Sequence, residues 1–201
     1  MKENVESIET VAVIGLGYVG LPLLKLMNDV GLKTLGIDID KERIEKLKLG
    51  QSYIDGISDD NLKSLNTEFN IGYDQISSAD VILICVPTPL NKAGLPDLSP
   101  LKSVIDGIIP HITTDQLICL ESTTYPGCTY EMITSQLSQR GFSPGEDINI
   151  AFSPEREDPG NGFYKTNNIP KLVGGATPNC AKRAESFYKQ FIEKVKVVSS
   201  C

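Results

Sequence analysis

The chain has 201 residues, of which 40% are hydrophobic and 22% are charged, and its formal net charge is −7 at pH 7. This length and composition are typical of one globular domain, or of one domain with an appendage. The acidic balance argues against nucleic acid and against an anionic membrane as partners, and no apolar run is long enough to span a bilayer.

The cysteines and the histidine limit the possible chemistry further. Five cysteines, an odd number without a Cys-x-x-Cys pair, suit free thiols in a reducing cytoplasm better than a disulfide framework or a zinc site. The N-terminal residues lack the apolar core of a signal peptide, so we expect a cytoplasmic protein. His111 is the only histidine, so a metal site or a Ser–His relay would lack further histidine ligands or partners, and we expect no metal.

The first predicted element is a strand at 11–14 that leads into a glycine-rich turn. Gly15 can adopt the backbone angles of a tight turn, and Gly17 leaves no side chain between the backbone and a pyrophosphate. Gly20 lets the following helix, which ends near Gly31, pack against the strand. The first N–H groups of this helix and the positive end of its dipole would face the phosphates. A strand, this turn and a helix together predict a dinucleotide site.

The second strand, at 34–37, ends in Asp38, at the separation expected for a carboxylate that binds the adenosine ribose. A carboxylate here accepts hydrogen bonds from the ribose hydroxyls and repels a 2′-phosphate, which favours NAD over NADP. Lys41 and Arg43 follow closely. Both are interpretable as solvated helix charges, and Arg43 alternatively as a residue that flanks the adenine or the phosphates.

Helices and apolar strands alternate through the rest of the chain, which predicts a doubly wound parallel sheet, a Rossmann-type α/β fold over 1–201. In such sheets ligands bind beyond the carboxyl ends of the strands. The candidate loops are therefore 15–20, the residue after 37, and 87–89, 121–127 and 153–161. Helices are expected at 41–49, 58–67, 98–111, 129–140 and 178–192, and strands at 69–73, 81–86, 116–120, 148–152, 171–173 and 194–198.

Four motifs in these loops resemble one family. They are Gly-Leu-Gly-Tyr-Val-Gly-Leu-Pro at 15–22, Val-Pro-Thr-Pro at 86–89, Glu-Ser-Thr-Thr-Tyr-Pro-Gly at 121–127 and Ser-Pro-Glu-Arg-Glu-Asp-Pro-Gly-Asn at 153–161. Together, and in this order, they resemble the UDP-glucose/GDP-mannose dehydrogenase family. The last two are most similar to the UDP-N-acetylhexosamine 6-dehydrogenase branch.

The resemblance implies an enzyme that oxidises C6 of a nucleotide-sugar hexose, here a UDP-hexose, from alcohol to carboxylate with two NAD. It implies that Thr123 contacts NAD and helps to hold a catalytic water, that Glu155 is the acid/base carboxylate, and that Glu155, Arg156 and Glu157 meet the sugar. The other NAD contacts expected from the glycine turn and the resemblance are Gly15, Gly17, Tyr18, Val19, Gly20, Asp38, Arg43, Pro87 and Thr88.

These roles are also chemically reasonable. Oxidation of an alcohol needs a proton acceptor, and a carboxylate in a partly desolvated loop suits that task. Thr123 is no base, so orientation of a water is its plausible share. Without the motif, Glu155 would be interpreted as a surface charge, the threonines as a polar turn, and Glu121 equally as a structural carboxylate that caps N–H groups.

The sequence also departs from the family. Pro159 stands where glucose-specific members carry a second glutamate, and Cys128 where a threonine is usual, which we interpret as a small buried thiol. Family members continue into a connecting helix, through which they commonly homodimerise, and a second domain with the catalytic cysteine. Neither matches this chain, so it resembles the NAD-binding half of such an enzyme, unable to turn over alone.

Two other functions remain open from the sequence. One is a non-catalytic NAD-binding or scaffolding module that acts through a partner. The other is a different dehydrogenase on the same fold, such as a 3-hydroxyacid enzyme. That class depends on a catalytic histidine, and His111 does not follow a strand end as the role requires.

Overall fold

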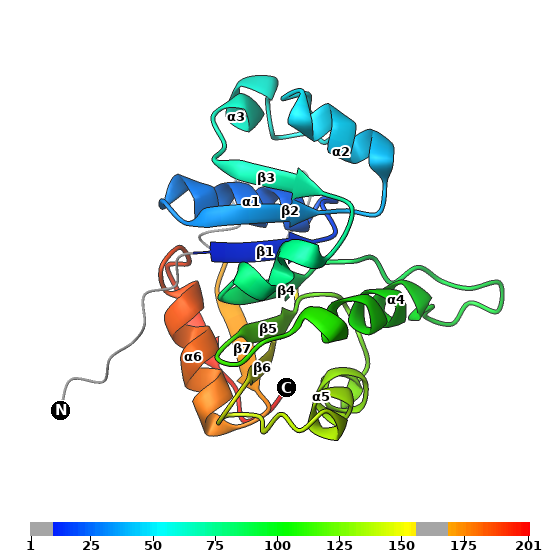
Figure 1. Ribbon diagram of the computed structural model, residues 1–201, viewed down its shortest axis with the longest axis vertical. Helices are drawn as coiled ribbons and strands as arrows, with labels where there is room; N and C mark the ends of the chain where they lie inside the picture. Colours follow the sequence, from blue (N-terminus) through cyan, green and yellow to red (C-terminus); the bar gives the residue numbers. More distant parts are fainter. Residues whose placement is uncertain (1–9, 156–168) are drawn as a thin grey trace.

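Eight strands form a single sheet at the centre of the computed structural model, which describes residues 10–155 and 169–201 (Figure 1). The strand order is β3-β2-β1-β4-β5-β6-β7-β8. The strands are β1 (Thr10–Ile14), β2 (Lys33–Ile37), β3 (Thr67–Asn70), β4 (Val81–Ile84), β5 (Leu117–Leu120), β6 (Asn149–Phe152), β7 (Lys171–Gly175) and β8 (Val195–Val197). The helices are α1 (Gly20–Asp29), α2 (Lys41–Lys48), α3 (Asp59–Lys63), α4 (Ser99–Ile108), α5 (Ser135–Gln139) and α6 (Pro178–Tyr188).

Helices cover both faces of the sheet, as Figure 1 shows. Successive side chains of a strand point to opposite faces, so each central strand contributes to two cores. In β1, Val11 and Val13 pack in the core that contains α1 and α6, whereas Ala12 and Ile14 pack in the core that contains α4 and α5. The expected doubly wound α/β fold is confirmed, and β1 to β6 run parallel to one another.

The last two strands correct the expectation of an all-parallel sheet. β7 runs antiparallel to β6, with Ala151 opposite Gly175 and Phe152 opposite Gly174, and β8 runs parallel to β7. The chain therefore reverses direction between β6 and β7. Strands β7 and β8, which α6 connects, are parallel to each other and run opposite to β1–β6. An apolar run of residues specifies burial but not direction, which is why the sequence pattern missed the reversal.

Several helices are shorter than their patterns predict. The expected helix at 98–111 ends at Ile108 and continues as a 3₁₀ turn over Ile109–His111, where Pro110 cannot donate a helical hydrogen bond. The expected helix at 129–140 divides into a π-helical turn over Tyr130–Thr134 and then α5. The other two shortened helices are α3, which ends at Lys63, and α6, which ends at Tyr188.

The parallel strands end together, and this alignment positions the candidate site. Backbone pairing places Ile37, Ile14, Ile84, Leu120 and Phe152 in one row across β2, β1, β4, β5 and β6. Each of these residues is the last of its strand. All five loops that the sequence marks as candidates therefore leave the sheet from the same edge, where doubly wound sheets bind ligands.

Candidate dinucleotide and active site

The three glycines of the first turn have three different surroundings. Gly15 has φ +89°, and a Cβ there would lie 2.8 Å from the Cys85 carbonyl oxygen. A Cβ on Gly20 would lie 1.9 Å from the Gly15 carbonyl oxygen, so α1 could not approach the turn. A Cβ on Gly17 would meet nothing within 4 Å. The protein therefore leaves no room for a side chain at Gly15 and Gly20, whereas Gly17 faces open space that a ligand can occupy.

Helix α1 begins directly behind this open face. The Leu21 N–H donates to the Gly17 carbonyl oxygen at 3.1 Å, which is the start of the helical hydrogen-bond pattern. No side chain caps the helix at Val19. The N–H groups of a helix's first turn have no helical acceptor and favour an anion. Of the two predicted contacts here, Tyr18 is 60% exposed and Val19 packs against the core.

Asp38 is buried at the end of β2 and is held by two backbone N–H groups. Its Oδ2 accepts from the Leu16 N–H at 2.8 Å and its Oδ1 from the Asp40 N–H at 2.9 Å. Each carboxylate oxygen has two lone pairs, so both oxygens still have capacity for a hydroxyl donor. The open face at Gly17 and this oriented carboxylate fit the diphosphate and the ribose of a dinucleotide.

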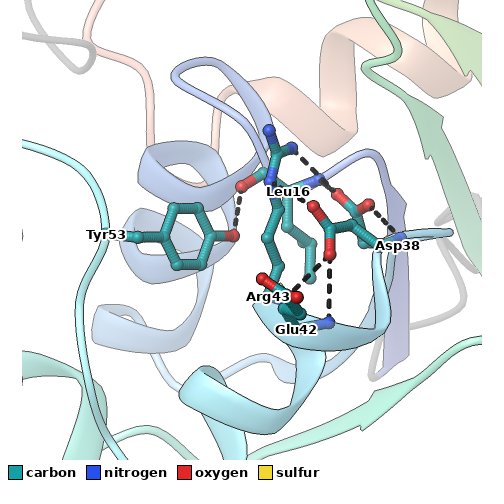
Figure 2. A network of polar contacts seen from close by, with 6 residues as sticks. Leu16, Asp38, Glu42, Arg43 and Tyr53 are labelled. Carbon is teal, nitrogen blue, oxygen red and sulfur yellow. Dashed lines mark hydrogen bonds and ion pairs between the residues drawn. The ribbon is translucent and has the colours of Figure 1, made fainter.

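Arg43 and Tyr53 lie beside Asp38 (Figure 2). The Arg43 Nη1 is 3.7 Å from Asp38 Oδ2, its Nε is 3.3 Å from Asp40 Oδ2, and its guanidinium lies 5.6 Å from the centroid of the Tyr53 ring. The Tyr53 hydroxyl donates to the Leu16 carbonyl oxygen at 2.6 Å. Burial, and to a lesser extent the Asp38 charge, raise the pKa of Tyr53, so it remains a neutral donor.

The loops after β4 and β5 are tied together by a hydrogen bond. The Thr88 hydroxyl donates to the Thr123 carbonyl oxygen at 2.8 Å. Pro87, the residue before Thr88, is exposed. The Ser122 hydroxyl donates to the Val86 carbonyl oxygen at 2.6 Å. The Thr123 carbonyl is occupied by this contact, while the residue is exposed. The structure thus brings the predicted residues of these two loops together.

Glu155 lies at the same edge of the sheet and faces a buried lysine. It stands three residues beyond Phe152, and Lys171 stands three residues before Gly174, so the antiparallel pairing of β6 and β7 places them opposite each other. The Lys171 Nζ is 3.8 Å from Glu155 Oε2. A lysine from β7, which runs antiparallel to β6, therefore reaches the edge at which β1 to β6 end.

Lys171 also pairs with Glu121 in the interior. Its Nζ lies 2.5 Å from Glu121 Oε2, and the Tyr188 hydroxyl donates to Glu121 Oε1. Burial acts to lower the pKa of Lys171, but attraction by Glu121 and Glu155 outweighs it and raises that pKa. Glu121 is thus a structural carboxylate, as one interpretation of the sequence has it, and it is held by the side chains of Lys171 and Tyr188.

A pocket of about 270 Å³ opens next to these strand ends. Thr124 and Pro154, the neighbours of Thr123 and Glu155, line it together with Phe152 and Leu172. Cys128, in the same loop region, is fully buried, as expected for a structural thiol. A larger hollow of about 540 Å³ lies between α2, α3 and β3.

Not every predicted residue can be placed. Arg156 and Glu157 lie outside the described residues. Conversely, sequence reasoning missed Tyr53 and Lys171, because neither belongs to a motif. Within residues 10–155 and 169–201, no cluster of three metal-binding side chains is found, and no helix is long and apolar enough to cross a membrane.

Comparisons with known proteins agree with this geometry. Residues 9–192 match the family model described as "UDP-glucose/GDP-mannose dehydrogenase family, NAD binding domain". The chain is 37% identical to Protein CapL of Staphylococcus aureus over 83% of the chain and 39% of that protein. It is 33% identical to the UDP-N-acetyl-D-glucosamine 6-dehydrogenase of Salmonella typhi over 90% of the chain and 43% of that protein.

A solved structure is similar over nearly the whole chain. The UDP-D-ManNAc dehydrogenase from Pyrococcus horikoshii superposes with a TM-score of 0.88 at 30% identity, over 95% of this chain and 47% of that one. The chain thus spans less than half the length of each of these three proteins.

Proposed function

Because the chain belongs to the UDP-glucose/GDP-mannose dehydrogenase family and spans its NAD-binding domain, we propose that it is the cofactor-binding half of an NAD-dependent dehydrogenase. The substrate is a UDP-N-acetylhexosamine, whose C6 hydroxyl is oxidised to the carboxylate. The observation that carries this proposal is the open face of Gly17 in front of α1, next to the anchored carboxylate of Asp38.

Different residues of the cofactor site bind the diphosphate and the adenosine ribose of NAD. The diphosphate lies against the backbone of Gly15, Gly17 and Gly20, where the N–H groups opening α1 point at it. Asp38 accepts from the adenosine ribose, which favours NAD over NADP. The remaining contacts to NAD come from exposed or partly exposed positions around the same edge, namely Tyr18, Val19, Arg43, Pro87, Thr88 and Thr123.

The catalytic half lies at the ends of β5 and β6. Bound NAD would supply the hydride acceptor for C6, and Glu155 accepts the proton of the C6 hydroxyl as general base. Thr123 has no basic group, and its share is to help hold a catalytic water. Arg156 and Glu157 contact the hexose. Supporting this arrangement, Glu155 faces a fixed cation, Lys171, and its neighbour Pro154 lines a pocket.

The substrate class rests on the relatives. Two similar proteins are named for UDP-N-acetylglucosamine and UDP-ManNAc, which differ in the configuration of one carbon. The chain covers 43% of the first of these proteins and 47% of the second, so more than half of each has no counterpart here. We accordingly infer that the chain binds NAD but does not turn over by itself. All five cysteines are free thiols, in keeping with a reducing cytoplasm.

Calorimetric titration of the chain with NAD, carried to millimolar concentration, tests the cofactor assignment. Saturable binding is expected, and Asp38→Ala should weaken it by about tenfold, because two ribose hydrogen bonds are lost (about 1.4 kcal/mol). Asp55→Ala removes an exposed carboxylate from the neighbouring loop and is the matched control. Absence of binding by the wild type would refute the proposal, as would equal binding by Asp38→Ala.

A further inference from the structure

The sequence near the end of β2 contains two opposing signals for cofactor choice. An acidic residue there favours NAD, whereas a nearby arginine accommodates the 2′-phosphate of NADP. This chain has both, Asp38 and, on the first turns of α2, Arg43. Which signal prevails depends on whether the guanidinium is available to a phosphate.

The structure shows what engages the guanidinium. Arg43 lies between Asp38 and Tyr53 (Figure 2). Its guanidinium nitrogens are 3.7 Å from Asp38 and 3.3 Å from Asp40, and the guanidinium carbon is 5.6 Å from the centroid of the Tyr53 ring. The Arg43 side chain is 45% exposed, so ion pairs alone would hold it weakly. A cation over an aromatic face within about 6 Å adds a directional attraction that fixes the plane of the guanidinium.

Tyr53 is itself anchored to the glycine turn. Its hydroxyl donates to the Leu16 carbonyl oxygen at 2.6 Å, while the Leu16 N–H donates to Asp38. The ring is partly buried and packs against the core on the α1 side of the sheet. One residue of the turn, Leu16, therefore positions both the carboxylate that binds the ribose and the ring that holds the arginine.

We propose that Tyr53 is a specificity-determining residue: by stacking under Arg43 it keeps the guanidinium on Asp38 and Asp40 and withholds it from a 2′-phosphate. The site then presents a buried carboxylate, and not an arginine, to the 2′ position of the adenosine ribose. This inference rests on the proposed NAD site. It assigns Tyr53 a role that acts through Arg43, without contact between Tyr53 and the cofactor.

The test compares the dissociation constants for NAD and NADP by calorimetry. Tyr53→Leu removes the stacking surface, and the preference for NAD over NADP should fall by about five- to tenfold, which matches the usual strength of a cation–π contact. Tyr53→Phe keeps the ring but loses the hydrogen bond to Leu16, so it should lose less of the preference than Tyr53→Leu. Tyr130→Leu, at a tyrosine that is 65% exposed on the π-helical turn after β5, is the control and should change nothing.

A double-mutant cycle shows whether the effect passes through Arg43. In an Arg43→Ala background, Tyr53→Leu should leave the ratio of the two dissociation constants unchanged. An unchanged ratio in folded Tyr53→Leu would overturn the inference, and so would an equal loss in Tyr53→Phe. Should Tyr53→Leu fail to fold, Arg43→Lys decides, because lysine keeps the charge but lacks the planar group. A reduced preference supports the inference, and an unchanged one overturns it.

These outcomes are distinguishable from failure of the proposed function. If the wild-type chain binds neither NAD nor NADP, the dinucleotide site is wrong and this inference falls with it. If the wild type binds NAD and only the selectivity of the variants is unaltered, the site stands and the role of Tyr53 is refuted.

Discussion

Gly17 and Gly20 are three positions apart in the same turn, yet the structure predicts opposite consequences for an added methyl group. At Gly20 the new Cβ would lie 1.9 Å from the Gly15 carbonyl oxygen, a backbone atom that cannot turn away. At Gly17 it would meet nothing within 4 Å. We therefore expect Gly20→Ala to damage the fold, and Gly17→Ala to damage the binding of NAD alone.

The magnitudes follow from the two environments. Gly20→Ala forces α1 away from the strand and should cost about 3 kcal/mol or more in the free energy of unfolding, at the severe end of overpacking. Gly17→Ala should leave this free energy within about 1 kcal/mol of the wild type, because alanine lowers the entropy of the unfolded chain without a clash. Its methyl group occupies the space of the diphosphate, so NAD should bind at least about tenfold more weakly.

Urea unfolding followed by circular dichroism gives the stability of each variant, and calorimetry gives its affinity for NAD. The informative result is a Gly17→Ala protein whose affinity for NAD falls while its free energy of unfolding stays near that of the wild type. A Gly17→Ala protein that unfolds as readily as Gly20→Ala would show that the turn is not open as described. One that binds NAD like the wild type would show that the diphosphate does not lie there.

Three further predictions concern charge. Asp38→Asn should weaken the binding of NAD about tenfold, as measured by calorimetry. It should also reduce the preference for NAD over NADP, because a neutral amide does not repel a 2′-phosphate. Lys171→Met should lower the free energy of unfolding by about 3–5 kcal/mol, since Glu121 is then buried without its cation, and adding Glu121→Gln should restore part of the loss. Burial raises the pKa values of Tyr53 and Tyr188 above the ordinary range. Their contribution to stability is therefore present below about pH 10 and lost as the pH rises further, which urea unfolding at pH 8 and 11 measures.

The parts of the site that the sequence predicts are those encoded within a few residues. The glycine turn and Asp38 follow strands that are continuous apolar runs, and such runs locate buried parallel strands well. The parts it does not predict depend on distant contacts. The Tyr53 hydroxyl reaches a carbonyl 37 positions away, and Lys171 reaches Glu121 over 50 positions. Neither residue lies in a pattern that distinguishes it from an ordinary loop tyrosine or strand lysine.

The apolar pattern overestimates the lengths of several helices for a related reason. Periodic apolar residues mark the face that packs, but they do not show where the hydrogen bonding changes. Gly107, the second-last residue of α4, faces the Tyr73 ring, and a Cβ there would lie 2.4 Å from Tyr73 Cε2. The residue that looks like a helix breaker is thus required by packing, whereas the real end of α4 comes at Ile108, just before Pro110.

The reversed direction of β7 connects these observations with the chemistry of the site. In a parallel arrangement, Lys171 at the start of β7 would lie at the edge of the sheet opposite to Glu155. The antiparallel register instead places the two residues opposite each other, with Nζ 3.8 Å from Oε2. A buried ion pair such as Lys171–Glu121 contributes little net stability, because desolvation offsets the attraction. Its consequence here is positional: Glu121 and Tyr188 hold in place the cation that the proposed base, Glu155, faces.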